Sequence, residues 1–380
     1  MAFAAALSEH PLPTHATGEV LGQVLEGLGG VAPDLAVLFV TGPHAGALED
    51  IAATVRSVLE PGTLLAATAV SVLGGREEAE EVAAISLWAG HTGPVHSAVF
   101  DAVEGPDGPA VTGVEAHDLD EAGTLVLLAD PASFPVDVFL QTLRERHPTL
   151  QVVGGLASAG FGPGVNRLVV DDRVLDRGAV GVLIPPEAAV TAVVSQGCEP
   201  VGAPFTVTRA ERNMIHEIAG RPALERVQEL IESMTPDQRQ KAAQGLHVGR
   251  VIDEHKDRFE RGDFLIRNVM GADRSNGAVA VGDTIEIGDT VQFQVRDADS
   301  ADDDLRLLLD GHVASAALVF TCNGRGRRLF GVSHHDATVV VDSLDTTAVA
   351  GMFCAGEIGP VGRRSFVHGF TASLAIFRDR

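Results

Sequence analysis

The sequence predicts a mixed α/β fold, with repeated strand-helix-strand modules that form mixed sheets with flanking helices, plus an antiparallel meander in the C-terminal half. Two observations support this prediction. Continuous apolar runs recur along the chain and end in polar turns, which is typical of strands buried on both faces. Short segments of alternating apolar and polar residues follow between residues 264 and 295, separated by turn residues.

The first module follows a helix predicted over 17–28, which a glycine pair ends. The run LAVLFVT at 35–41 has the continuous apolar character of a buried strand. A polar turn then leads into a helix over 48–59, which a proline-glycine pair stops. A second apolar stretch over 63–72 and a short strand over 83–88 complete the module.

The same order of elements recurs twice further along the chain. In each copy a buried strand ends in a polar turn, and the next apolar strand reaches a glycine-rich loop. The predicted elements of these copies are a helix over 136–146 and strands at 124–129, 151–155, 179–184, 316–322, 351–354 and 372–377. We interpret this pattern as a loosely repeated module built on mixed sheets.

The pattern changes between the second and third copies. Leucine and valine recur at helical spacing over 222–234, and a polar helix follows over 235–243. Extended segments are predicted at 189–195, 205–209, 264–269, 278–281, 284–287 and 290–295, with a turn over 197–204. A boundary near Pro222 predicts an N-terminal extension and helix at 1–31, a first domain at 32–221 and a second domain at 222–380.

The amino-acid composition excludes several classes of function. With 28 basic against 52 acidic residues, the net charge is −24, so sequence-independent binding to nucleic acid or to an anionic membrane is not expected. The absence of tyrosine excludes tyrosine catalysis. The three cysteines form no CxxC pair, the N-terminus lacks the basic start of a signal peptide, and no charge-free apolar stretch reaches about 18 residues. We therefore expect a cytoplasmic protein.

Two glycine- and arginine-rich loops follow buried strands near the C-terminus, CNGRGRR at 322–328 and GEIGPVGRR at 356–364. Glycine lets backbone N–H groups approach an anion, and ligands of α/β folds commonly bind where strands end. The five arginines therefore predict a site for a carboxylate or a phosphate. Alternatively, the loops are tight turns with solvated arginines. Neither loop is a Walker or GxGxxG motif, so nucleotide binding is not specifically indicated.

Other chemistry finds little support. The spacing of Cys322, His334, His335 and Cys354 matches no zinc pattern, so no metal is predicted. The segment LASAG at 156–160 lacks the first glycine of the G-x-S-x-G motif, and no catalytic residue is predicted. An aspartate-rich stretch beginning at 297 lacks the glycine and the terminal glutamate of a calcium loop and is better explained as the start of a helix.

The C-terminal segments resemble those of the FIST family, a two-part sensory module found in bacterial signalling proteins and in F-box proteins. The segments that carry the resemblance are FTCNGRG at 320–326, GMFCAGEIGP at 351–360 and FVHGFTA at 366–372, with FLIRN at 264–268 and VQFQVRD at 291–297 upstream. Residues 193–198, 200–202 and 219–223 are similar to the end of the FIST N-terminal part. The resemblance extends from about Ala32 to the C-terminus.

The resemblance implies a sensor that binds a small ligand, with amino acids proposed for the family, and signals to a partner. No output domain is recognised, so the signal is expected to pass through a separate signalling protein or a homo-oligomer. The predicted ligand site consists of Asn323, Arg325, Cys354, Gly356, Glu357 and His368. Arg325 would pair the ligand carboxylate and Glu357 an ammonium group, with hydrogen bonds from Asn323 and His368.

Two alternatives remain open. The first is an enzyme that acts on a small metabolite through Cys354 or Cys322. The second is a haem-based gas sensor, because a subgroup of bacterial FIST-like proteins is associated with haem and nitric oxide. His368 would then be the first candidate ligand of the iron, although no haem motif supports it and no cofactor is predicted.

Overall fold

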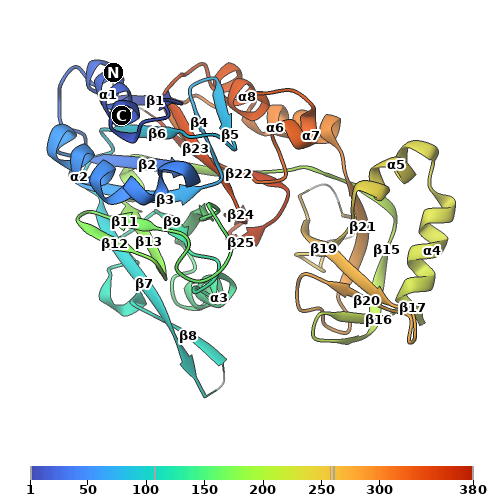
Figure 1. Cartoon of the computed structure of the whole chain (residues 1–380). Helices are drawn as coiled ribbons and strands as arrows, with labels where there is room; N and C mark the ends of the chain where they lie inside the picture. The colour runs from blue at the N-terminus through green and yellow to red at the C-terminus, as the bar shows by residue number, and fades with distance from the viewer. Residues whose placement is uncertain (1, 107, 257, 260–261, 379–380) are drawn as a thin grey trace. The chain divides into compact units, whose positions relative to one another are not determined.

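The computed structural model describes residues 2–106, 108–256, 258–259 and 262–378, and the chain forms two compact units. The larger unit comprises residues 1–194, 305–367 and 371–380 (Figure 1). The smaller unit comprises residues 195–304 and 368–370. Both units are therefore assembled from segments that are distant in the sequence.

Three strand-helix-strand modules build the larger unit, and each holds a pair of parallel neighbouring strands with a helix in the connection between them. The elements are β2 (Leu35–Thr41), α2 (Leu48–Leu59) and β3 (Thr63–Ala69); β9 (Thr124–Ala129), α3 (Val136–Arg146) and β10 (Gln151–Leu156); and β22 (Ala316–Cys322), α8 (His335–Leu344) and β23 (Val349–Cys354). The predicted repetition of strand-helix-strand modules in mixed sheets is confirmed.

A third strand lies antiparallel to the first strand of each module. These strands are β6 (Ile85–Gly90) beside β2, β13 (Ala179–Ile184) beside β9 and β26 (Thr371–Phe377) beside β22. All residues of the three first strands are buried except Cys322. Burial on both faces explains why these strands appear in the sequence as continuous apolar runs.

The fourth position of each sheet is filled by a hairpin from another module. The hairpin of β4 (Ser71–Gly74) and β5 (Glu77–Glu80) pairs with β23, that of β11 (Leu168–Val170) and β12 (Arg173–Leu175) with β3, and that of β24 (Glu357–Val361) and β25 (Arg364–His368) with β10. The first module thus donates to the third, the second to the first and the third to the second. This cyclic exchange ties the three modules together.

A single central core joins the three sheets of the larger unit. It contains Trp88, Phe39 and Phe320, which come from the first and third modules, together with Val126 from the second. The Trp88 ring packs on Phe377 with centroids 4.9 Å apart, and its Nε1 donates a hydrogen bond to the Ala348 carbonyl oxygen at 3.2 Å. The only tryptophan therefore has a structural role at the junction of two modules.

Helices cover the outer faces of these sheets. A second apolar cluster lies under α1 (Pro13–Gly27) and α2, a third under α3, and a fourth under α8 and the end of α6 (Ala298–Leu309). The remaining strands of these sheets are β1 (Phe3–Ser8), β7 (His96–Gly105), β8 (Gly108–Thr112) and β14 (Thr191–Gln196), and a short helix α7 (Arg327–Phe330) follows β22. In the described part of the chain, every helix is too short or too polar to cross a lipid bilayer.

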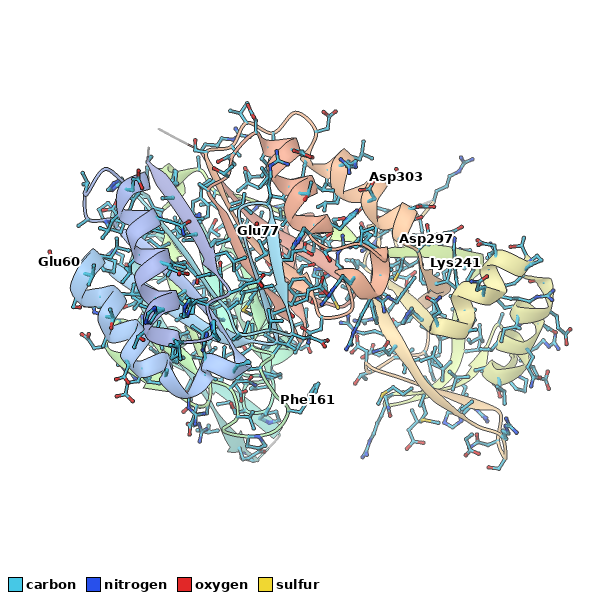
Figure 2. All side chains as sticks on the ribbon, turned by 45° about the horizontal axis from the view of Figure 1, so that its top comes forward. Glu60, Glu77, Phe161, Lys241, Asp297 and Asp303 are labelled. Atoms are coloured by element: carbon cyan, nitrogen blue, oxygen red, sulfur yellow. The ribbon has the colours of Figure 1, made fainter. Side chains whose placement is uncertain are left out.

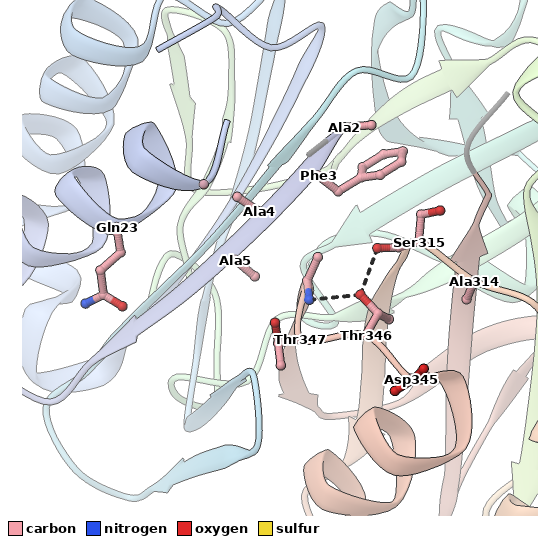
Figure 3. Close-up of a pocket in the computed structure, with 12 residues that line it drawn as sticks. Ala2, Phe3, Ala4, Ala5, Gln23, Ala314, Ser315, Asp345, Thr346 and Thr347 are labelled. Carbon is pink, nitrogen blue, oxygen red and sulfur yellow. Dashed lines mark hydrogen bonds between the residues drawn. The ribbon is translucent and has the colours of Figure 1, made fainter. Parts of the chain in front are cut away.

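The N-terminal strand β1 was not predicted, although it pairs with β6 along its whole length. A cavity of about 390 Å³ lies beside it (Figure 3). The hydroxyl of Thr346 closes one wall, because it donates to the Ser315 carbonyl oxygen at 2.8 Å and accepts from the Ala348 N–H at 3.2 Å. Alanines make up much of the remaining lining, together with Phe3, and Gln23 and Asp345 are its larger polar side chains.

The smaller unit is a seven-stranded sheet in which every described pairing is antiparallel, as predicted, although the strand at 290–296 pairs with those at 198–211 and 246–251 and not with the one at 278–281. Its order is β15 (Cys198–Glu211), β21 (Thr290–Arg296), β18 (Leu246–Val251), β19 (Phe264–Asp273), β20 (Ala278–Val281), β16 (Met214–Ile218) and β17 (Arg221–Pro222). The amphipathic helix α4 (Ala223–Ser233) contributes Leu230 to its core. In Figure 2, Lys241 of α5 (Pro236–Gln244) lies beside Asp297, and the ion pair measures 2.6 Å.

Two local predictions in this unit are wrong. Residues 198–204 of the predicted turn at 197–204 lie within β15, whose pairing with β21 has an irregular register between Val201 and Phe205. The predicted strand at 284–287 is irregular and leads into a turn, and carboxylates accept two of its backbone N–H groups. Asp283 accepts from the Thr284 N–H at 2.8 Å, and Asp289 accepts from the Glu286 N–H at 2.9 Å.

Candidate functional site

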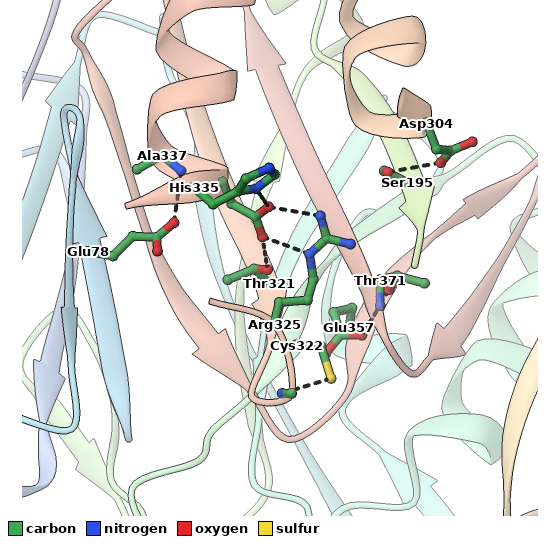
Figure 4. Close-up of polar contacts among 12 residues, drawn as sticks. Glu78, Ser195, Asp304, Thr321, Cys322, Arg325, His335, Ala337, Glu357 and Thr371 are labelled. Atoms are coloured by element: carbon green, nitrogen blue, oxygen red, sulfur yellow. Dashed lines mark hydrogen bonds and ion pairs between the residues drawn. The ribbon is translucent and has the colours of Figure 1, made fainter. Parts of the chain in front are cut away.

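A polar cluster lies where β22 and β23 end (Figure 4). Cys322 and Cys354 are partners in the parallel register, so the two loops that the sequence singles out begin at the same end of this strand pair. Asn323 and Arg325 follow β22, and Glu357 begins β24 after β23. The structure therefore brings most of the predicted site residues to one edge of a sheet, where α/β folds commonly bind ligands.

The centre of the cluster is a buried ion pair between Arg325 and Asp336. Nε of Arg325 donates to Oδ2 of Asp336 at 2.7 Å, NH2 donates to Oδ1 at 2.8 Å, and both side chains are 0% exposed. Thr321 adds a hydroxyl hydrogen bond of 2.7 Å to Asp336. Burial alone would raise the pKa of Asp336, but the guanidinium outweighs burial and holds this pKa well below its usual range.

The ion pair with Asp336 uses two of the three nitrogens of the Arg325 guanidinium for hydrogen bonds. The third nitrogen, NH1, is buried and has no hydrogen-bond partner among the described residues, as is also true of Oδ1 of Asn323. The Phe330 ring lies against the guanidinium, 5.1 Å from its central carbon. One nitrogen of Arg325, with its two N–H groups, is therefore left without a partner among the described residues, while the contacts of the other nitrogens fix its orientation.

Glu357 is the second buried acid of the cluster. Its Oε2 accepts hydrogen bonds from the Thr371 N–H at 3.2 Å and from the Thr371 hydroxyl at 2.8 Å. Burial raises the pKa of Glu357 to about 8, although Thr371, Arg325 and Cys322 each oppose the shift. Most of this carboxyl group is therefore protonated at pH 7, and a cation placed beside it would ionise it.

The structure adds Glu78, which the sequence does not point to. It lies on β5, in the hairpin that the first module donates, and its Oε1 accepts from the Ala337 N–H at the start of α8 at 2.9 Å. Burial and the neighbouring Asp336 raise the pKa of Glu78 to about 7. Nothing local in the sequence indicates this contact, because it depends on the exchange of hairpins between modules.

We expect the protein to lose stability as the pH rises from about 6.5 to 8.5. Folded Glu357 holds its proton up to a pKa of about 8, far above its ordinary value of 4.5, so between these values the folded state binds more protons than the unfolded state. Each such proton lowers the free energy of unfolding by at most about 1.4 kcal/mol per pH unit. The pKa of His247, lowered to about 4 from 6.5 chiefly by burial, opposes this trend only below pH 6.5.

Urea denaturation at several pH values measures this slope. The Glu357→Gln variant should lose most of the decline above pH 7, because Glu78, with its pKa of about 7, releases its proton at lower pH than Glu357 and contributes less there. Glu77→Gln removes an exposed glutamate of β5 and should keep the slope of the unmodified protein. Equal slopes in all three proteins would show that Glu357 is not protonated in the folded state.

The other four arginines of the two loops do not contribute to the cluster around Arg325. Arg327 pairs with Glu80 at 3.4 Å and Arg328 with Glu81 at 2.9 Å, so the acidic residues of the donated hairpin and the residue after it neutralise the first loop. Arg363 and Arg364 line a different cavity, beside α3. The five arginines therefore do not form one common anion site.

The other predicted site residues lie in three different settings. Cys354 is buried at the end of β23, and burial raises the pKa of its thiol well above the ordinary value, which disfavours the nucleophilic thiolate. Gly356 packs against Leu156, which a Cβ at this position would approach to 3.0 Å. His368 is buried and belongs to the smaller unit, whereas the other five residues belong to the larger one.

Comparison with known proteins gives the family of this chain. The model of the FIST N domain matches residues 34–221, and that of the FIST C domain matches residues 223–360. The chain therefore belongs to the FIST family. FIST domains are sensory domains of signal-transduction proteins.

Two mycobacterial relatives match along almost their whole length. An uncharacterized protein of Mycobacterium tuberculosis is 41% identical over 389 residues, which cover 100% of both chains. An uncharacterized protein of Mycobacterium bovis is 40% identical over 375 residues, which cover 97% of each chain. This chain is therefore similar to both over nearly its whole length.

Proposed function

We propose that this protein is a sensor that binds a small carboxylate ligand, with amino acids as the leading class, and signals to a separate protein. The observation that carries the proposal is a pair of buried polar atoms without hydrogen-bond partners among the described residues, Arg325 NH1 and Asn323 Oδ1. Buried polar atoms in folded proteins are nearly always paired. Both atoms lie beside the ends of β22 and β23, so one ligand bound there could satisfy both.

The chemistry of the cluster favours a ligand that carries both charges. Arg325 NH1 can donate to a carboxylate oxygen, and Asn323 Oδ1 can accept from an N–H group of the same ligand. The Glu357 carboxylate, once it is ionised, can pair with an ammonium group of the ligand. Cys354 and Gly356 precede Glu357 in the sequence and would lie near the ligand without adding charge.

A ligand ammonium group beside Glu357 predicts release of a proton on binding. Since the pKa of Glu357 is about 8, the ammonium must ionise this carboxyl, and nearly one proton should leave the protein at pH 7. A thermal-shift screen of amino acids and matched carboxylates first identifies a ligand, because binding to the folded state raises the melting temperature. Calorimetric titration in buffers of different ionisation enthalpy then counts the protons.

Conservative variants locate the site. Glu357→Gln should bind the screened ligand without releasing a proton, and Asn323→Ala should weaken binding by about tenfold, the cost of one lost hydrogen bond to a charged ligand. Glu77→Gln is the matched control and should behave as the unmodified protein. Binding that is unchanged in both Glu357→Gln and Asn323→Ala would contradict the proposed site.

A further inference from the structure

A second cavity of the larger unit lies between α3 and the hairpin of β24 and β25. Its volume is about 300 Å³, at the lower end of the range for small-molecule sites. The last turn of α3 and the loop after it form one side, and the hairpin turn at Arg363 and Arg364 forms the other. None of the residues that make the strand-end cluster lines this cavity.

Basic residues line both sides of the cavity. Arg144, His147, Arg363 and Arg364 line it, and none of its described lining residues is acidic. The Arg144 guanidinium lies over the Phe366 ring, 4.8 Å from the ring centre, which holds it in place from the hairpin side. The exposed carboxylate of Asp120 is bound to Nδ1 of His147 at 2.6 Å. In a chain of net charge −24, this group of basic residues favours the binding of an anion in the cavity.

Apolar side chains line the same cavity. They are Leu140, Leu143, Leu150 and Val152, and all four are buried members of the apolar cluster under α3. A free phosphate would leave these side chains without a partner in the cavity, whereas an aliphatic group would cover the apolar surface they expose there and gain about 25 cal/mol for each Å² removed from water. The occupant therefore needs a small anionic head and an apolar body.

We propose that this cavity is a binding site for a monocarboxylate with a short aliphatic body and no amino group. Arginine pairs a carboxylate through parallel hydrogen bonds, and the leucines accept the hydrocarbon. An α-amino acid is disfavoured, because no acidic residue among those lining the cavity can pair its ammonium group. The site is independent of the strand-end cluster, since the two share no residue.

The cavity lies beside a chain segment that continues to other parts of the molecule. The hairpin that carries Arg363 and Arg364 begins with Glu357 and continues through β25 to His368, where the chain enters the smaller unit. A carboxylate bound at the hairpin turn contacts the segment that links these two places.

Three compounds with one carbon skeleton test the assignment. 4-Methylpentanoate has the carboxylate and the aliphatic body, leucine adds an ammonium group, and 4-methylpentan-1-ol lacks the charge. Titration calorimetry on the full chain should show saturable binding of 4-methylpentanoate. Its affinity at this site should exceed those of the other two compounds by about tenfold or more, and it should fall as the salt concentration rises.

Variants assign the binding to the cavity. Arg364→Glu should abolish binding of 4-methylpentanoate, and Arg363→Ala should weaken it by about tenfold. Arg173→Glu, an equal charge change at an exposed position of β12, should leave it unchanged. Glu357→Gln should also leave it unchanged, which separates this site from the strand-end cluster. The assignment is overturned if 4-methylpentanoate does not bind, if Arg364→Glu has no effect, or if leucine binds equally well in an Arg364-dependent way.

Discussion

Replacing Asp336 by alanine is expected to lower the free energy of unfolding by about 3–5 kcal/mol. The substitution leaves the Arg325 guanidinium buried at 0% exposure without its counter-charge and removes the acceptor of the Thr321 hydroxyl. A buried charge that loses its partner keeps the whole cost of its desolvation, and this cost makes the effect large. Urea denaturation at neutral pH measures it.

The control lies on the same helix. Asp342 of α8 pairs with Arg76 at 2.6 Å, but these side chains are 47% and 54% exposed, so Asp342→Ala should cost less than about 1 kcal/mol. The double variant Arg325→Met/Asp336→Leu removes both charges and should be more stable than Asp336→Ala alone. If Asp336→Ala costs no more than Asp342→Ala, the buried pair does not stabilise the fold as described.

Alanine at Gly351 or Gly154 is expected to destabilise the protein by about 3 kcal/mol. A Cβ at Gly351 of β23 would overlap the Val319 carbonyl oxygen of β22, and one at Gly154 of β10 would overlap the Leu127 carbonyl oxygen of β9. The obstacle in both cases is the backbone of the parallel neighbour, which cannot rotate away as a flexible side chain could. Gly154 also has a φ of +153°, which an L-residue rarely adopts.

Gly22 supplies the contrast. It is exposed in α1, and nothing lies within 4 Å of a Cβ added there. Gly22→Ala should therefore stabilise the protein by about 0.5–1 kcal/mol, because alanine loses less conformational freedom than glycine in a helix. Thermal or urea unfolding of the three variants tests the prediction, and a neutral Gly351→Ala would show that β22 and β23 are not packed this closely.

Local patterns in the sequence predicted the framework of the larger unit well. The buried strand β2 and the helices α2 and α3 were predicted with their observed bounds, since a continuous apolar run and an amphipathic period each arise within one element. The hairpin of β4 and β5 was not predicted as such. Its place depends on pairing with β23, which is far away along the chain, and no local pattern carries that information.

The candidate site was predictable to a similar degree. The glycine- and arginine-rich loops pointed to Asn323, Arg325 and Glu357, which do lie at the same strand ends. The partner of Arg325 was missed, because the segment HDATVVVDSL that carries Asp336 is rich in β-branched residues and lacks a recognisable helix signal. Glu78 was missed because only the hairpin exchange brings it to α8.

Calorimetric titration of a ligand from the amino-acid screen tests the sensor proposal most directly. We expect binding at one site per chain, with release of nearly one proton at pH 7 that disappears in Glu357→Gln. Failure of every screened amino acid and carboxylate to bind, or binding that releases no proton and is unaffected by Glu357→Gln and Asn323→Ala, would contradict it.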